Sequence, residues 1–106
     1  MRIRLKPFPV LVACEGCPAH GQSARDVARR LDAAGLAEAS WLGDVRSLPT
    51  VRAKVRSRYP VYALDACERG CARAWLQAAG ASVQRELVLR AGEPVEAEAA
   101  RLAKEL

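Results

Sequence analysis

Two continuous apolar runs constrain the fold of this chain most strongly. The runs are Val10–Ala13 and Val61–Leu64. An uninterrupted apolar run of this length is typical of a strand covered on both faces in a parallel sheet, whereas a strand with one wet face would alternate. Each run leads directly into a closely spaced pair of cysteines, and the pairs contain every cysteine of the chain: Cys14, Cys17, Cys67 and Cys71. The sequence therefore predicts two buried parallel strands, each followed by a loop that carries two thiols.

A helix is predicted after each cysteine pair. The first helix has Ser23 placed to cap its start, with Asp26 three positions later, and Gly35 placed to end it. Its apolar positions recur at helical spacing: Ala24, Val27, Ala28 and Leu31. The second helix ends at Gly80, and one face carries Ala72, Trp75, Leu76 and Ala79. From this spacing we expect Trp75 to lie in the core.

The rest of the chain continues the alternation of strand and helix. We expect a strand at 39–42, a short helix at 49–57, a strand at 83–89 and a last helix opened by Glu93 and Pro94. The inner stripe of that last helix is Val95, Ala99, Leu102, Ala103 and Leu106. Four strand–helix units predict an α/β fold with a four-stranded parallel sheet, helices on both faces and strand order 2-1-3-4, as in Rossmann-like or flavodoxin-like proteins. The length of 106 residues predicts one domain, residues 1–106.

This strand order predicts that the two cysteine loops meet. The first and third strands become neighbours, and their carboxyl ends flank the crevice in which such sheets bind ligands. Four thiolates suit tetrahedral zinc, copper(I) or an iron–sulfur cluster. We therefore expect one metal site formed by Cys14, Cys17, Cys67 and Cys71, with Zn²⁺ as the first choice and an iron–sulfur cluster as the alternative. The same pairs, each at a helix N-terminus, would also suit a thiol-disulfide or sulfur-transfer enzyme.

Four polar residues flank these cysteines. His20 could reach the site as an alternative or outer ligand, but an exposed turn residue is the simpler interpretation, since four cysteines fill a tetrahedron. Asp65, at the predicted end of the third strand, could support a metal ligand, but it is rather expected to brace the second loop by accepting backbone N–H groups. Arg69 and Arg73 could offset the negative charge of the thiolates. No constellation of carboxylates and histidine next to the pairs supplies a general base, so catalysis is the weaker interpretation.

The basic charge of the chain is concentrated in one stretch. The net charge is +5, and the excess gathers at Arg46, Arg52, Lys54, Arg56 and Arg58. Because this spacing fits a solvated helix face whose apolar side is Leu48, Val51 and Val55, nucleic-acid binding is not favoured. The longest apolar stretch near the start, Phe8–Ala13, has only six residues, too few for a membrane span. We expect a cytoplasmic, reduced protein, and the sequence identifies neither a protein partner nor an oligomeric state.

Taken together, these segments resemble the Asp-Gly-Cys (DGC) domain family. The resemblance spans most of the chain and rests on residues 13–17, Gly21 and Gln22, residues 63–67 and 71–73, and the helix end at Ala79 and Gly80. It implies a four-cysteine zinc site without an assigned biochemical activity, and three roles stay open for such a protein: metal handling, sensing and presenting an interaction surface. The naming motif departs from the family, since it reads Asp65-Ala66-Cys67 here, with alanine in place of glycine. The alanine implies an ordinary backbone conformation at position 66 and leaves all four cysteines in place.

Overall fold

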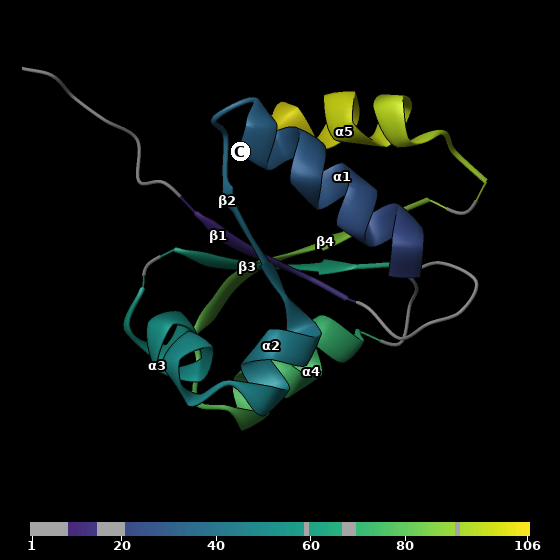
Figure 1. Cartoon of the computed structure of the whole chain (residues 1–106). Helices are drawn as coiled ribbons and strands as arrows, with labels where there is room; N and C mark the ends of the chain where they lie inside the picture. Colours follow the sequence, from purple (N-terminus) through teal and green to yellow (C-terminus); the bar gives the residue numbers. More distant parts are fainter. Residues whose placement is uncertain (1–8, 15–20, 59, 67–69, 91) are drawn as a thin grey trace, which may run out of the picture.

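The computed structural model describes residues 9–14, 21–58, 60–66, 70–90 and 92–106, and within them the chain forms a four-stranded sheet (Figure 1). The strands are β1 (Val10–Ala13), β2 (Glu38–Trp41), β3 (Val61–Asp65) and β4 (Val83–Val88). Their order is β2-β1-β3-β4, and every neighbouring pair is parallel. The predicted α/β fold and its strand order are therefore confirmed.

The register of the sheet places the carboxyl ends of β1 and β3 side by side. Val10 is opposite Val61 and Ala13 is opposite Leu64. The ladder continues one residue beyond β1, because the N–H of Cys14 donates to the carbonyl oxygen of Leu64 at 2.9 Å. Cys14 therefore lies at the carboxyl end of β1, directly beside the end of β3.

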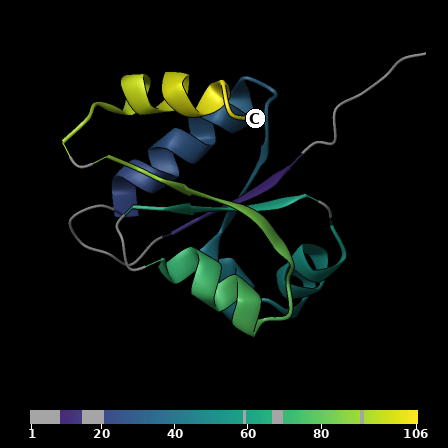
Figure 2. The ribbon, with the colours of Figure 1, turned by 180° about the vertical axis from the view of Figure 1, so that it is seen from behind.

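Five helices in the described residues cover the two faces of this sheet (Figures 1 and 2). On one face lie α1 (Gly21–Ala33) and α5 (Val95–Ala103), and on the other lie α2 (Leu42–Ser47), α3 (Pro49–Ser57) and α4 (Cys71–Ala78). Because side chains alternate along a strand, β1 contributes to both layers. Leu11 and Ala13 pack with α1 and α5, while Val10 and Val12 pack with α2, α3 and α4. This arrangement explains why both runs are continuously apolar.

Only the C-terminal end of α1 matches the prediction. Gly35 adopts φ +75°, the N–H of Leu36 donates to the carbonyl of Leu31 at 3.0 Å, and the N–H of Gly35 donates to that of Asp32 at 2.9 Å. This pattern is the Schellman motif expected of a glycine that ends a helix. The predicted cap at Ser23 is wrong, because the backbone is already helical from Gly21 and Ser23 lies inside the first turn.

The segment after β2 also differs from the prediction. The strand ends at Trp41, and Leu42 begins α2, a helix that the sequence analysis did not predict. Leu42 and Val45 give α2 its buried side. The next helix, α3, has the predicted bounds, but Leu48 precedes it and is 45% exposed, so Leu48 does not belong to its apolar side. The buried residue of α3 is Val55.

Trp75 is a second correction to the predicted core. It lies on α4 next to the buried Leu76, yet it is 45% exposed. The guanidinium of Arg46, from α2, lies over its ring with 4.3 Å between the guanidinium carbon and the ring centroid. Helical spacing predicted the helix correctly, whereas the burial of Trp75 depends on how far α2 and α3 extend over α4.

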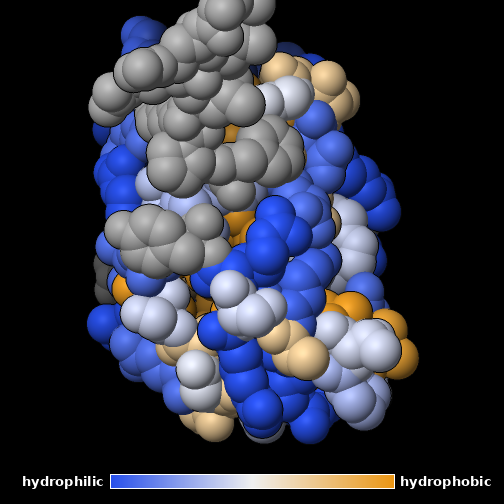
Figure 3. Space-filling model, turned by 90° about the vertical axis from the view of Figure 1, so that its left-hand side faces the viewer, coloured by the Kyte–Doolittle hydropathy of each residue, from blue (hydrophilic) through white to orange (hydrophobic). Residues whose placement is uncertain are grey.

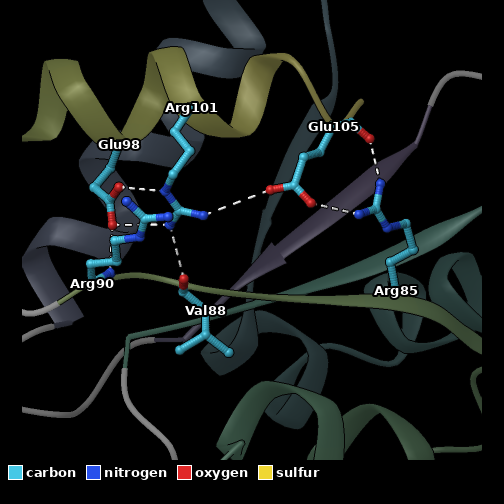
Figure 4. A network of polar contacts seen from close by, with 6 residues as sticks. All are labelled: Arg85, Val88, Arg90, Glu98, Arg101 and Glu105. Carbon is cyan, nitrogen blue, oxygen red and sulfur yellow. Dashed lines mark hydrogen bonds and ion pairs between the residues drawn. The ribbon is translucent and has the colours of Figure 1, made fainter.

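A network of polar contacts fastens α5 to β4 (Figure 4). The carboxylate of Glu98, which is only 3% exposed, accepts the N–H of Arg90 and pairs with Arg101 at 2.8 Å. Arg101 in turn donates to the carbonyl of Val88 at 3.0 Å. The predicted inner stripe of α5 is confirmed, because all its members belong to the core: Val95, Ala99, Leu102, Ala103 and Leu106.

Figure 3 shows the side of the molecule that lies on the left in Figure 1. Hydrophilic residues predominate among the coloured residues of this face, and hydrophobic residues form only small patches on it. Within the described residues, no helix combines the length and the apolar character that crossing a bilayer requires.

Candidate metal site at the carboxyl ends of β1 and β3

The structure describes one cysteine from each predicted pair, and both lie on the same side of the sheet. Cys14 follows β1, is 2% exposed and belongs to the apolar cluster that includes Val10 and Val12. Cys71 is the first residue of α4, is partly buried and packs against the same cluster. Two thiols that are far apart in the sequence are thereby brought to one layer and one edge of the sheet, because β1 and β3 are neighbours.

The other two predicted ligands, Cys17 and Cys67, lie outside the described residues, and so does His20. The described part of the chain contains no group of three or more His, Cys, Asp or Glu side chains that could hold a metal. Since only two of the four predicted ligands belong to that part, the four-cysteine site remains a prediction.

Asp65 fixes the position at which α4 begins. It is the last residue of β3 and only 1% exposed. Its Oδ1 accepts the backbone N–H of Ala72 at 2.7 Å, and its Oδ2 lies 3.5 Å from the backbone nitrogen of Arg73. These bonds satisfy N–H groups that the first turn of a helix leaves without an internal partner. Asp65 therefore braces the junction between β3 and α4, as predicted, and so holds Cys71 near the end of β1.

The surroundings of Asp65 raise the pKa of its carboxyl group to about 6. Burial is the largest cause, since it penalises the charged form, and the nearby carboxyl of Glu86 acts in the same direction. The N–H groups of Ala72 and Arg73 oppose the shift by stabilising the carboxylate. A neutral carboxyl group would still offer a carbonyl oxygen to the N–H of Ala72.

Gly70 is a residue of this junction that sequence reasoning did not single out. It precedes α4 in the left-handed conformation, with φ +65° and ψ 39°. A Cβ at this position would lie 2.9 Å from Oε2 of Glu86. The backbone conformation therefore favours glycine, and a residue with a Cβ would also have to displace the Glu86 carboxylate. The sequence offered one signal for this role of Gly70: it directly precedes a helix that starts with a predicted metal ligand. A single sequence does not, however, reveal the φ angle of that glycine.

Predictions were also made for Ala66, Arg69 and Arg73, and of these Arg69 lies outside the described residues. Among the described residues no residue other than glycine has positive φ, so Ala66 has the ordinary backbone conformation expected of alanine. It is 7% exposed and packs into the core beneath α1. Arg73 lies with its Nε 3.5 Å from Oε2 of Glu86. Its charge is thus engaged by a carboxylate, and an additional role in offsetting thiolate charge stays a prediction.

The thiol of Cys71, at the start of α4, and that of Cys14 lie in the same layer of the fold. Cysteine sulfur is a donor of the soft kind that zinc, copper(I) and iron–sulfur clusters accept.

Comparison with known proteins gives two matches. The model of the DGC domain family matches residues 10–105. A protein of Pseudomonas aeruginosa named anaerobic and virulence modulator AnvM is 41% identical over 71 residues, which cover 66% of this chain and 54% of that protein. The chain thus spans about half the length of this relative. No solved structure matches the chain.

Proposed function

The chain belongs to the DGC domain family, and from this membership we propose that it is a zinc-binding protein in which Cys14, Cys17, Cys67 and Cys71 hold one ion. The observation that carries the proposal is the position of Cys14 and Cys71 against one apolar cluster at the carboxyl ends of β1 and β3. Each of them brings the second cysteine of its pair within a few residues along the chain. The proposed ligand set therefore comes from the segments that follow two neighbouring strands, β1 and β3.

The donor set favours a closed site over a catalytic one. Catalytic zinc usually has three protein ligands and an open position for water, whereas four thiolates complete a tetrahedron. The carboxyl group at the end of β3, that of Asp65, is engaged with the backbone of α4. Zinc held in this way would supply cohesion between the two loops and leave the thiolates unreactive while it is bound.

The proposed role is regulatory. The relative in Pseudomonas aeruginosa is named as a modulator, and a closed zinc site suits a protein that acts through its surface rather than through turnover. In this proposal the metal orders the two loops in the reducing cytoplasm, and loss of zinc or oxidation of the thiols loosens them. The surface that a partner meets would then depend on the metal and redox state of the cell.

One observation favours a second candidate, a thiol-disulfide or sulfur-transfer enzyme. Cys71 is partly exposed at a helix N-terminus, while Cys14 is buried. A partly accessible thiol and a protected thiol in the same layer form the arrangement expected of an attacking and a resolving cysteine. An iron–sulfur cluster would use the same four ligands as zinc.

Purification without oxygen, followed by elemental analysis and an absorption spectrum, separates these candidates. The proposal predicts one zinc per chain and no visible chromophore, and it predicts loss of the zinc in Cys67→Ser. His20→Ala is the matched control, since it removes the only histidine of the chain and should retain the metal. A brown chromophore would indicate an iron–sulfur cluster. Metal-free protein with a reversible disulfide would support the thiol enzyme and contradict the zinc proposal.

A further inference from the structure

The basic stretch of the sequence separates into two groups in the structure. Lys54 and Arg58 point to Glu38, with nitrogen–oxygen distances of 2.9 Å and 3.0 Å. Arg46, Arg52 and Arg56 instead surround a hollow of about 290 Å³ between α2, α3 and α4. The remaining residues of this arginine–tryptophan hollow are Val45, Trp75, Ala78 and Ala79. The solvated helix face predicted from the sequence therefore describes only part of the stretch.

Two of the three arginines are held in place by carbonyl groups. Arg52 donates from Nε to the carbonyl of Val45 at 3.2 Å and from Nη2 to that of Arg46 at 2.7 Å. Arg56 donates from Nε to the carbonyl of Ala79 at 2.8 Å. Since a guanidinium has five N–H donors in a fixed plane, these bonds orient the group and leave other donors for a ligand.

The positive charge of the hollow is not balanced by ion pairs within the described residues. No carboxylate there lies within 4.0 Å of the guanidinium nitrogens of Arg46, Arg52 or Arg56. None of the described residues that line the hollow is acidic. Backbone carbonyls orient guanidinium groups without neutralising them, so the hollow has the charge that an anion would complement.

Trp75 adds a flat apolar surface to this charge. It is 45% exposed, although it lies on the helix that otherwise buries Ala72 and Leu76. Arg46 lies over its ring. A partly exposed indole beside oriented guanidinium groups offers apolar surface and charged donors together, and Trp and Arg are enriched where proteins bind partners. The hollow thus presents a planar apolar surface and an anion-binding edge together.

We propose that the arginine–tryptophan hollow binds a small planar organic anion. The carboxylate or phosphate group would lie against the guanidinium groups of Arg52 and Arg56, and the ring would lie against Trp75. The volume of about 290 Å³ is close to the lower end of the range of small-molecule sites, about 300–1,000 Å³, so the ligand is the size of a mononucleotide or smaller. The site goes beyond the zinc proposal and shares no ligating residue with it.

Fluorescence of Trp75 provides the test. In a Trp41→Phe background, Trp75 is the sole tryptophan, and adenosine monophosphate and benzoate serve as the phosphate and carboxylate probes. Saturable quenching by either probe is expected, and binding should weaken as salt is added. The probe that binds more tightly identifies the anionic group. Inorganic phosphate should bind at least about tenfold more weakly than adenosine monophosphate if the ring contributes, as one good contact is worth about that factor.

Three variants locate the binding. Arg56→Gln should weaken it about tenfold or more, since hydrogen bonds to charged groups carry that much free energy. Arg52→Gln should also weaken it, because Arg52 is the other guanidinium proposed to contact the anion. Lys54→Gln is the matched control, because it lies on α3 but pairs with Glu38, and binding should be retained. Circular dichroism on each variant checks that the fold is intact.

Three results would overturn the proposal. The first is the absence of saturable binding of both probes to the folded protein. The second is binding that is unchanged in both arginine variants or equally tight for inorganic phosphate. The third is binding only of a single-stranded oligonucleotide or a polyglutamate peptide, which would make the hollow part of a macromolecular surface.

Discussion

Replacing Gly70 by alanine tests whether the junction before α4 requires glycine. The left-handed conformation at φ +65° costs a residue with a Cβ about 1–2 kcal/mol. Gly35 has φ +75° with no atom within 4 Å of a Cβ built there, so Gly35→Ala is a control that carries the conformational cost alone. At Gly70 the added methyl group would lie 2.9 Å from Oε2 of Glu86, and the carboxylate must move away.

The additional cost at Gly70 follows from what Glu86 contacts. Its Oε2 lies 3.5 Å from Nε of Arg73, whose side chain is 51% exposed. Exposed ion pairs contribute about 0.2–1 kcal/mol, so the displacement adds at most about 1 kcal/mol. We therefore expect Gly35→Ala to lower the free energy of unfolding by about 1–2 kcal/mol, and Gly70→Ala by up to about 1 kcal/mol more. For a domain of this size, 1 kcal/mol corresponds to a Tm shift of about 4–8 °C.

Thermal and urea denaturation of both variants, at equal metal loading, measures these differences. In a Glu86→Ala background the extra cost at Gly70 should disappear, while the cost at Gly35 should remain, as expected of a double-mutant cycle. The reasoning would be refuted if Gly70→Ala were as stable as the unmodified protein. It would also be refuted if the difference between the two glycine variants survived the removal of Glu86.

Three further predictions concern other parts of the fold. Arg101 lies beside Glu98 and lowers the pKa of that buried carboxyl group below its usual 4.5. The contribution of the Glu98 carboxylate to the free energy of unfolding is therefore fully present above pH 4.5 and is lost as the pH falls through the folded-state pKa. Glu98→Gln should cost about 1.5–3 kcal/mol at pH 7 in urea denaturation, and the difference should shrink below pH 4.5; a constant difference down to pH 3 would contradict this. Asp65→Ala should cost about 1–2 kcal/mol and Asp65→Asn less, because asparagine retains an oxygen for the N–H of Ala72; equal costs would show that this bond is not what Asp65 provides. Chelation of metal should leave the far-ultraviolet helix signal largely intact, since both apolar clusters are built from the sheet and its helices; loss of that signal at ordinary temperature would contradict an independent core.

The sheet and its order were predictable because two segments admit only one environment. Val10–Ala13 and Val61–Leu64 are apolar on both faces and therefore had to be covered on both. The bounds of α3 were predictable from Pro49 at its first position and the helical spacing that follows. Helix α2 was not predictable, because it has six residues, includes Gly43 and follows β2 without a loop.

The sequence was sufficient to predict at which edge of the sheet the candidate site lies, but not the detailed geometry of the site. Strand neighbours decide where Cys14 and Cys71 lie, and the sequence indicated those neighbours. The bracing role of Asp65 followed from its place at a strand end, whereas the need for Gly70 depends on φ and on Glu86 from β4, a long-range contact. The exposure of Trp75 likewise depends on α2, whose existence the sequence did not reveal.

X-ray absorption at the zinc edge tests the central claim most directly, because it reports the atoms bound to the ion. The account predicts a first shell of four sulfur atoms at about 2.3 Å in the unmodified protein, with one zinc per chain. Cys14→Ser and Cys71→Ser, which alter the two described thiols, should each lose zinc or show one sulfur fewer. A shell dominated by nitrogen or oxygen, or a shell unchanged when either cysteine is replaced, would contradict a single site built from both loops.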